Sequence, residues 1–408
     1  MKRIFTLIVL MEILFAEVQT TKISTVERDM VQHTAMNLYK LDALAGQTIQ
    51  VNIDKLNADA DLYLKIGEEP SLHSYNCKSV NSDVSKDTCT IKLEKDSSLY
   101  IGVYGFRSSE YRLHTKLLAY GDKGLDTVEV TKYHDGSSVI VHPKSWNNEP
   151  TPVVFFVPGF RSSSYKDYST LIKFIASHGC SVVYVKDNAD INDKDIDTRF
   201  KKFKTIVDEY ASKLNTSKIG IVGHSSGSGI SFALLEKMIE SKTKWGENGR
   251  FLFAIEPWFS FGMGQSNMKS IVDTNMVFLQ FGERGSSSDP RISVVEYNLL
   301  TGITNSQKDY QVYSKENADH SYPEGSRPIY KMQGIAKPLD ALMKYTFNSD
   351  PAAYSTALNQ GSDEPYISGL VELKDIKYYG EGGCVGNHIN QKKMLDKYDI
   401  DYCAIGDR

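Results

Sequence analysis

The sequence has no surplus of charge of either sign, because 47 basic residues stand against 51 acidic ones in 408 residues, a formal net charge of −4. Nucleic-acid binders usually carry a clear basic excess, so the charge gives no support to a nucleic-acid partner. The chain also lacks internal repeats and low-complexity tracts, and its composition is near the globular average. This excludes a disordered, collagen-like or coiled-coil protein, and the length indicates two or three domains.

Long apolar runs are absent except at the N-terminus, where Lys2 and Arg3 precede the run Ile4–Met11. That run is too short for a span of roughly 20 residues, and Ala16 offers a small residue for cleavage. We therefore predict a signal peptide over residues 1–20 and a secreted, extracellular protein, with the periplasm or cell surface as variants. An uncleaved N-terminal anchor is the alternative.

Cysteine is scarce, with five residues in the whole chain. In an exported protein thiols tend to pair, and the economical pairing is Cys77 with Cys89 and Cys384 with Cys403. Cys180 then remains free. It enters an apolar run, so we interpret it as a buried small hydrophobic residue rather than a nucleophile.

Residues 21–118 alternate apolar and polar side chains in short runs separated by turn-forming residues. The clearest runs are Thr48–Ile53, Asp61–Ile66 and Leu99–Tyr104, each with period two. This pattern is typical of strands with one buried face. It predicts a small all-β sandwich.

Residues 124–350 instead alternate strands with helices, the pattern of a mostly parallel sheet covered on both faces. A hairpin around Asp135-Gly136 opens the region, and an amphipathic helix runs from Phe200 to Leu214. A closing helix is expected to end near Phe347. Residues 351–408 are expected to form a C-terminal extension held by a disulfide. The predicted strand cores are Thr127–Thr131, Val139–Val141, Val153–Val157, Val182–Val185, Ile219–Val222, Phe251–Ile255 and Met276–Phe281.

The motif G-H-S-S-G at Gly223–Gly227 follows an apolar strand and precedes a helical pattern. Small residues flanking a serine in a strand-turn-helix setting let the chain turn sharply and expose the hydroxyl. Ser225 is therefore the predicted nucleophile. The alternative is a glycine-rich turn that binds phosphate or nothing, but the lysine of a phosphate-binding loop is missing.

A serine nucleophile needs a base and a carboxylate, in the chain order serine, acid, histidine for this kind of fold. His320 is the only histidine that follows Ser225 within the α/β region, so it is the predicted base. Two carboxylates compete in the loop after Met276–Phe281. We favour Asp289, which a serine-rich approach leaves free to reach the imidazole, over Glu283.

The oxyanion of an acyl-transfer intermediate requires two backbone donors, one after the nucleophile and one after an early strand. These positions predict the N–H groups of Ser226 and Phe160. The side chains of Phe160 and Trp258 are expected to contact substrate. Phe259 and Phe261 are expected to add aromatic surface around an open cleft, because the 17 residues Phe259–Asn275 leave little room for a lid. Core packing is the alternative for Trp258 and Phe261.

The first region resembles the bacterial pre-peptidase C-terminal domain, through Asp59–Tyr63, the two cysteines Cys77 and Cys89, and Tyr100–Gly105. The resemblance implies a jelly-roll-like accessory module of secreted hydrolases, with those cysteines bridged and no catalytic residue. It also raises calcium binding at Asp59 and Asp61, for which ordinary turn chemistry is the alternative.

The second region resembles the cutinase-like polyester hydrolases related to dienelactone hydrolases, from about Pro150 to Ser349. The resemblance rests on Val157–Phe160, Ala176–Gly179, Gly223–Gly227, Pro257-Trp258 and Asp319-His320. It implies an α/β-hydrolase fold with Ser225, His320 and Asp289 as triad, Phe160 and Ser226 as oxyanion donors, and Trp258 against the acyl group.

These observations predict a secreted serine ester hydrolase of the carboxylesterase, lipase or cutinase-like kind, which acts through an acyl-enzyme without a metal or organic cofactor. The expected substrate is a hydrophobic or polymeric ester, and the β-domain would bind a surface or polymer. The alternatives are a secreted serine peptidase of the same fold and a non-catalytic adhesion or binding protein.

Overall fold

The computed structural model describes residues 18–21, 25–43, 46–119, 127–160, 162, 164–186, 193–241, 244–281, 289–313, 318–358, 366–367 and 388–402. The chain divides into two compact units, Met1–Asp122 and Lys123–Arg408. Each unit is described by itself. None of the helices in the described ranges is long and apolar enough to cross a membrane. Most of the predicted signal peptide, residues 1–17, lies outside the described residues.

The first unit is a β-sandwich, as the alternating pattern predicts. One sheet has the strand order β1-β3-β8-β5-β6 and the other β2-β9-β4-β7. The strands are β1 (Gln19–Thr20), β2 (Val26–Val31), β3 (Met36–Ala43), β4 (Thr48–Asp54), β5 (Asp61–Ile66), β6 (Cys77–Ser79), β7 (Asp87–Lys92), β8 (Ser97–Tyr104) and β9 (Ser109–Ala119).

The core of the sandwich consists of the inward-facing members of these alternating strands. Leu62 and Leu64 of β5 and Ile49 and Val51 of β4 are fully buried, and each such side chain contributes about 1.5–3 kcal/mol on leaving water. A disulfide between Cys77 of β6 and Cys89 of β7 joins the two sheets. That pairing is confirmed.

The second unit contains a mixed sheet with the strand order β10-β11-β13-β12-β14-β15-β16-β17-β18. The pairs from β13 through β17 are parallel, whereas β10, β11 and β18 run antiparallel to their neighbours. This is the α/β-hydrolase arrangement that the sequence predicts. The strands are β10 (Val128–Lys132), β11 (Val139–Pro143), β12 (Thr151–Val157), β13 (Ser181–Tyr184), β14 (Leu214–His224), β15 (Arg250–Ile255), β16 (Asn275–Phe281), β17 (Lys308–Tyr313) and β18 (Tyr366–Ile367).

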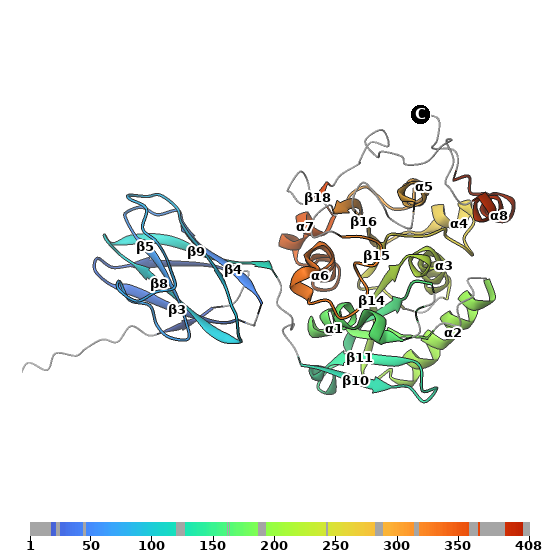
Figure 1. Ribbon diagram of the computed structural model, residues 1–408, viewed down its shortest axis with the longest axis horizontal. Coiled ribbons are helices and arrows are strands. Elements are labelled where there is room, and N and C mark those ends of the chain that lie inside the picture. Colours follow the sequence, from blue (N-terminus) through green and yellow to red (C-terminus); the bar gives the residue numbers. More distant parts are fainter. Residues whose placement is uncertain are drawn as a thin grey trace, which may run out of the picture. The chain divides into compact units, whose positions relative to one another are not determined.

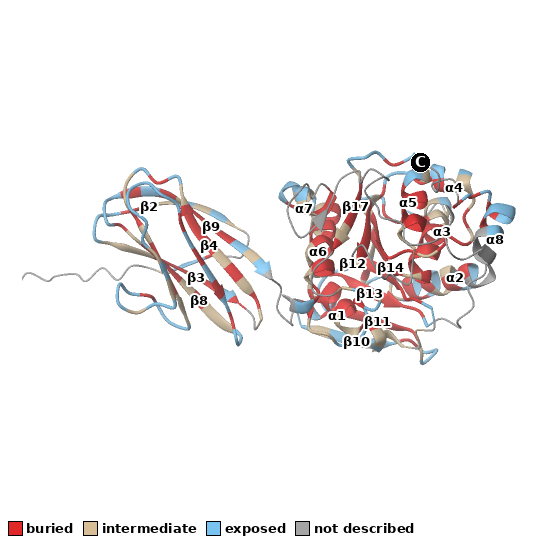
Figure 2. Cartoon of the chain, turned by 45° about the horizontal axis from the view of Figure 1, so that its top comes forward, coloured by how far each residue is buried: buried red, intermediate tan, exposed pale blue. Residues whose placement is uncertain are grey.

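Helices cover both faces of this sheet, and most residues of its central strands are buried (Figures 1 and 2). Successive residues of β12 show the alternation: Phe155 packs on Phe203 of one helix, and Phe156 packs on Tyr168 across the sheet. The helices are α1 (Ser169–Ser177), α2 (Asp193–Glu209), α3 (Ser226–Glu240), α4 (Gln265–Ser270), α5 (Pro290–Leu299), α6 (Gln333–Asn348), α7 (Tyr354–Leu358) and α8 (His388–Tyr398), with 3-10 turns η1 (Lys144–Asn147), η2 (Tyr165–Tyr168), η3 (Ile329–Lys331) and η4 (Pro351–Ala353).

Two features of the second unit differ from expectation. β17 is a strand that the apolar pattern does not reveal. The C-terminal extension also contributes to the core, because Met394, Ile400 and Tyr402 are fully or almost fully buried. Its predicted disulfide, Cys384 with Cys403, lies outside the described residues. Cys180 is buried, and burial raises the pKa of its thiol to about 12, as expected of an inert core cysteine.

Candidate active site

Ser225 occupies a one-residue turn between β14, which ends at His224, and α3, which begins at Ser226. Its backbone has φ of 54° and ψ of −125°, a conformation that costs a non-glycine residue about 1–3 kcal/mol. Three backbone hydrogen bonds hold it: the Ser225 N–H donates to the Ile255 carbonyl at 2.9 Å, and the Trp258 and Gly229 N–H groups donate to the Ser225 carbonyl at 3.0 and 3.1 Å. The neighbouring strand therefore stabilises the strained serine.

The two glycines of the motif give this turn its space. A Cβ on Gly223 would lie 2.6 Å from the Ser228 Cα, and a Cβ on Gly227 would lie 2.2 Å from the Pro158 carbonyl oxygen. Both distances are too short for real Cβ atoms. The elbow therefore requires glycine at both positions, as the G-x-S-x-G pattern predicts.

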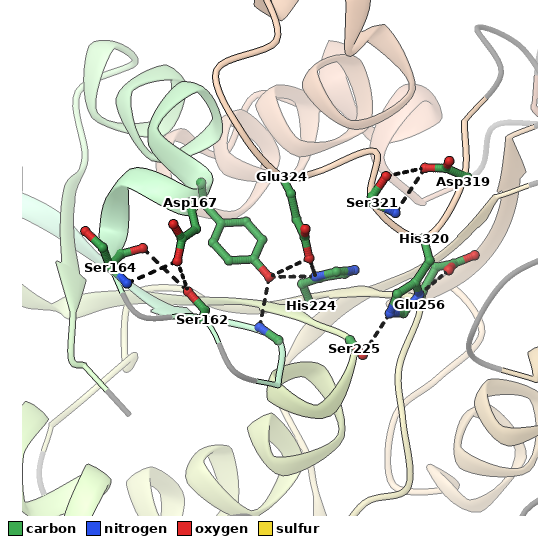
Figure 3. A network of polar contacts seen from close by, with 12 residues as sticks. Ser162, Ser164, Asp167, His224, Ser225, Glu256, Asp319, His320, Ser321 and Glu324 are labelled. Atoms are coloured by element: carbon green, nitrogen blue, oxygen red, sulfur yellow. Dashed lines mark hydrogen bonds and ion pairs between the residues drawn. The ribbon is translucent and has the colours of Figure 1, made fainter. Parts of the chain in front are cut away.

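The structure brings Ser225 and His320 together, as the chain order predicts (Figure 3). The His320 Nε2 atom lies 2.9 Å from the Ser225 Oγ atom, and the His320 Nδ1 atom lies 2.7 Å from the Glu256 Oε2 atom. An ionised carboxylate only accepts hydrogen bonds, so Nδ1 carries the imidazole proton and Nε2 presents its lone pair to the serine hydroxyl. His320 is one-fifth exposed, and the Glu256 side chain is fully buried.

Glu256 directly follows β15 and is fixed through both carboxylate oxygens. While Oε2 faces His320, Oε1 accepts a hydrogen bond from the Phe281 N–H at the end of β16, at 3.0 Å. Its backbone has φ of 42°, the left-handed region that side chains rarely adopt, so its conformation is another local strain at the site. The carboxylate is thus held rigidly below the imidazole.

The structure contradicts the prediction that Asp289 is the triad acid, because His320 pairs with Glu256 instead. Asp289 caps α5 by accepting a hydrogen bond from the Arg291 N–H at 3.0 Å, and it pairs with the buried Arg291 guanidinium at 2.6 Å. Its carboxylate thus serves a helix end. The alternative, Glu283, lies outside the described residues. Sequence reasoning missed Glu256, although a glutamate at the end of a continuous apolar strand, Phe251–Ile255, was a usable signal.

The predicted oxyanion donors, the N–H groups of Phe160 and Ser226, belong to segments that adjoin the serine. A Cβ on Gly159 would lie 3.4 Å from the Ser225 Cβ, so the loop that carries Phe160 passes beside the nucleophile. Ser226 is the first residue of α3, where N–H groups and the helix dipole favour developing negative charge. The Phe160 side chain is 55% exposed, in keeping with a position at a rim.

The other aromatic residues differ in their exposure. Trp258 is half-buried and packs against Phe259, with ring centroids 5.0 Å apart. Phe259 and Phe261 are buried in the core, so the expectation that they add aromatic surface around the serine is wrong. Of the predicted aromatic set, Phe160 and Trp258 remain able to contact a substrate.

Calcium binding at Asp59 and Asp61 gains no support from the geometry. Among the described residues, no group of three or more histidine, cysteine or acidic side chains is arranged to hold a metal ion. Burial, followed by the charges of Asp59 and Asp87, raises the pKa of Asp61 to about 6. Asp87 is buried and accepts hydrogen bonds from Ser79 and from the Asn81 N–H.

The site thus belongs to the class of α/β proteins with a serine-histidine-glutamate arrangement at the carboxyl edge of the sheet. Comparisons with known proteins bear mainly on the first unit. Residues 36–105 match the bacterial pre-peptidase C-terminal domain family, which confirms the resemblance of that segment. A curated relative is the alkaline serine exoprotease A of Vibrio alginolyticus, 29% identical over 68 residues, which are 17% of this chain and 12% of the relative.

Solved structures are similar to each unit. The pre-peptidase C-terminal domain of a Bacillus anthracis collagenase aligns with 24% of this chain and 95% of its own, at 13% identity and a TM-score of 0.21. A second solved structure comes from a structural analysis of two fungal esterases from Rhizomucor miehei. It aligns with 57% of this chain and with 86% of its own length, at 12% identity and a TM-score of 0.40.

Proposed function

We propose that the protein is a secreted serine hydrolase that cleaves carboxylic esters through an acyl-enzyme. One observation carries the proposal: the unbroken line of hydrogen bonds from Ser225 Oγ through His320 to the buried carboxylate of Glu256. A strained serine, a base at hydrogen-bond distance and an acid that orients the base are the parts that nucleophilic acyl transfer requires.

In the proposed reaction the Ser225 hydroxyl adds to the ester carbonyl carbon while His320 Nε2 takes its proton. The carbonyl π electrons move to the oxygen, where the N–H groups of Phe160 and Ser226 stabilise the charge. The carbonyl re-forms, the alkoxide leaves and takes the proton from His320, and the acyl group stays on Ser225. Water then repeats the sequence, releasing the acid and restoring the serine. Glu256 keeps its charge throughout and stabilises the imidazolium.

The proposed substrate is an ester with a hydrophobic acyl part, including polymeric esters of the kind that cutinase-like hydrolases cleave. Support comes from the exposed Phe160 and the half-buried Trp258 on the two loops that flank Ser225. The accessory β-domain would retain the enzyme on a surface or polymer. Three features support an extracellular location. They are the family match of the β-domain, the disulfide of the same domain, and the basic residues and apolar run at the N-terminus.

A serine peptidase is the second candidate. One specific observation favours it: 68 residues of this chain align at 29% identity with a serine exoprotease. The alignment covers only 12% of the exoprotease, so it supports a secreted hydrolase more than any particular bond cleaved.

The test is hydrolysis of short, medium and long p-nitrophenyl acyl esters by the mature chain, with a peptide p-nitroanilide measured beside them. We expect ester turnover that Ser225→Ala abolishes, with a chain-length preference that separates esterase from lipase or polyester hydrolase. Turnover of the anilide alone would support the peptidase. No turnover of either, with no labelling of Ser225 by a fluorophosphonate, would contradict a serine hydrolase.

A further inference from the structure

A second histidine, His224, lies next to His320. His224 directly precedes the nucleophile and is fully buried, and its ring centroid lies 4.7 Å from that of His320. Burial, with repulsion from His320, lowers the pKa of His224 to about 3, so its ring stays neutral. Its Nδ1 atom lies 2.8 Å from the Tyr168 hydroxyl.

The Tyr168 hydroxyl contacts three segments of the chain. It accepts a hydrogen bond from the Gly159 N–H of the oxyanion loop at 3.0 Å. It also contacts His224 Nδ1 of the elbow and lies 3.5 Å from Glu324 Oε1, four residues beyond His320. Tyr168 is itself buried, and burial raises the pKa of its hydroxyl, so the group remains protonated.

The Tyr168 hydroxyl has a single proton, which it donates to the Glu324 carboxylate at 3.5 Å. Its oxygen accepts from the Gly159 N–H, and the neutral His224 ring lies against the same oxygen through Nδ1. One hydroxyl thereby orders the elbow, the oxyanion loop and the loop that carries the base.

A further contact joins the base loop, which carries His320 and Glu324, to the residue before Tyr168. The Gly325 N–H donates to the Asp167 carbonyl at 2.5 Å. The Asp167 carboxylate accepts hydrogen bonds from the Ser162 hydroxyl at 3.0 Å and the Ser164 N–H at 3.1 Å. The residues after the oxyanion loop and those after His320 are therefore fixed against each other on the same side of the nucleophile.

We infer that Tyr168 is a positioning residue that sets the oxyanion loop and the base loop at their working distance from Ser225. The inference rests on the proposed function. Because Gly159 is held by Tyr168, the next peptide N–H, that of Phe160, keeps a fixed direction toward the developing oxyanion. Removing the hydroxyl should therefore weaken binding of the transition state and leave substrate binding almost unchanged.

The test compares Tyr168→Phe with the full-length wild type on a p-nitrophenyl ester. We expect kcat to fall about 10- to 100-fold, less than the 10²- to 10³-fold for loss of a whole oxyanion donor, with KM within about threefold. The affinity for an alkyl boronic acid, which forms a tetrahedral adduct with the serine, should weaken in parallel with kcat/KM.

The matched control is Tyr310→Phe, which removes another buried hydroxyl of the same unit, bonded to two residues of α5: Ser293 Oγ at 2.8 Å and the Pro290 carbonyl at 3.3 Å. It should lower the melting temperature without changing kcat. Unchanged kcat in Tyr168→Phe, or a boronic acid affinity that falls no more than in Tyr310→Phe, would overturn the inference.

Variants of the half-exposed Glu324 keep the inference falsifiable should Tyr168→Phe fail to fold. Glu324→Gln retains an acceptor for the Tyr168 hydroxyl and should keep kcat within about threefold, while Glu324→Leu should lose several-fold more. Equal kcat in the two variants would contradict the network. The rate of Ser225 labelling by a fluorophosphonate needs no substrate, so an absence of ester turnover would count against the proposed function while labelling still tests Tyr168.

Discussion

The assignment of Glu256 as triad acid makes a sharp prediction for Glu256→Gln. The glutamine amide has one acceptor and one donor end, while the site offers two donors, His320 Nδ1–H and the Phe281 N–H. Whichever way the amide turns, its NH₂ group meets one of them. The side chain at position 256 is fully buried, so the conflict falls on these protein partners.

The conflict is resolved at His320, since the Phe281 N–H is fixed in the backbone and the imidazole can change tautomer. With NH₂ toward the ring, Nδ1 becomes the acceptor and Nε2 carries the proton. That nitrogen then cannot take the proton of Ser225. A triad in the wrong tautomer loses about 10⁴ in kcat, and we expect a fall of about 10³- to 10⁴-fold with a small change in KM.

The assay is steady-state hydrolysis of the best p-nitrophenyl ester, with Asp289→Asn as the control variant. Asp289→Asn retains the helix cap and should lose stability through the buried Arg291, but its kcat should stay within about twofold. The reasoning is refuted if Glu256→Gln keeps kcat within tenfold of the wild type, or if Asp289→Asn loses as much activity as Glu256→Gln.

Three further predictions concern stability. The raised pKa of Asp61, about 6, means that the folded state binds the proton more tightly than the unfolded one, so this group destabilises the first unit as pH rises from about 4 to about 6. Asp61→Asn should therefore stabilise that unit by about 1 kcal/mol at pH 7, after allowing for solvent screening of a half-exposed group, and should do nothing at pH 3; thermal melting at both pH values checks this. Tyr402→Phe should cost about 1–3 kcal/mol in chemical denaturation, because its hydroxyl donates to the fully buried Glu296 at 3.1 Å. Replacing Cys77 and Cys89 together by serine should cost the first unit about 2–4 kcal/mol in the same measurement, and a change near zero would count against the disulfide as a constraint.

Most strands could be predicted because their buried residues form a regular apolar pattern along the sequence. Strand β17 could not, because its sequence Lys308–Tyr313 is largely polar although it is mostly buried. The Lys308 ammonium donates to the Tyr297 and Leu300 carbonyls, and the Gln311 amide donates to Asp309. The partners of Lys308 are the end of α5 and the residue after it, which only the folded chain brings to this strand, so no local pattern marks Lys308 as core.

The residues of the candidate site differ in the same way: some have a local sequence signal, and others are defined only by partners that the fold brings to them. Ser225 and His320 could be found, since a strained turn needs glycines nearby and chain order leaves one histidine. The acid could not be found by searching loops for a carboxylate, because Glu256 is a buried group at a strand end whose partners come from residues 281 and 320. Asp289 looked free in the sequence, and only the fold pairs it with Arg291.

The packing of Tyr402 has a consequence for how the protein is made. Its ring contacts that of Phe259, and its hydroxyl lies 3.0 Å from the Ser260 Oγ atom, in the segment that follows Glu256. The segment after the acid is therefore packed by a residue that lies 142 positions further along the chain than Ser260. During synthesis the strands of the first unit can pair as soon as they emerge, whereas the segment around Glu256 lacks this packing until Tyr402 has been made.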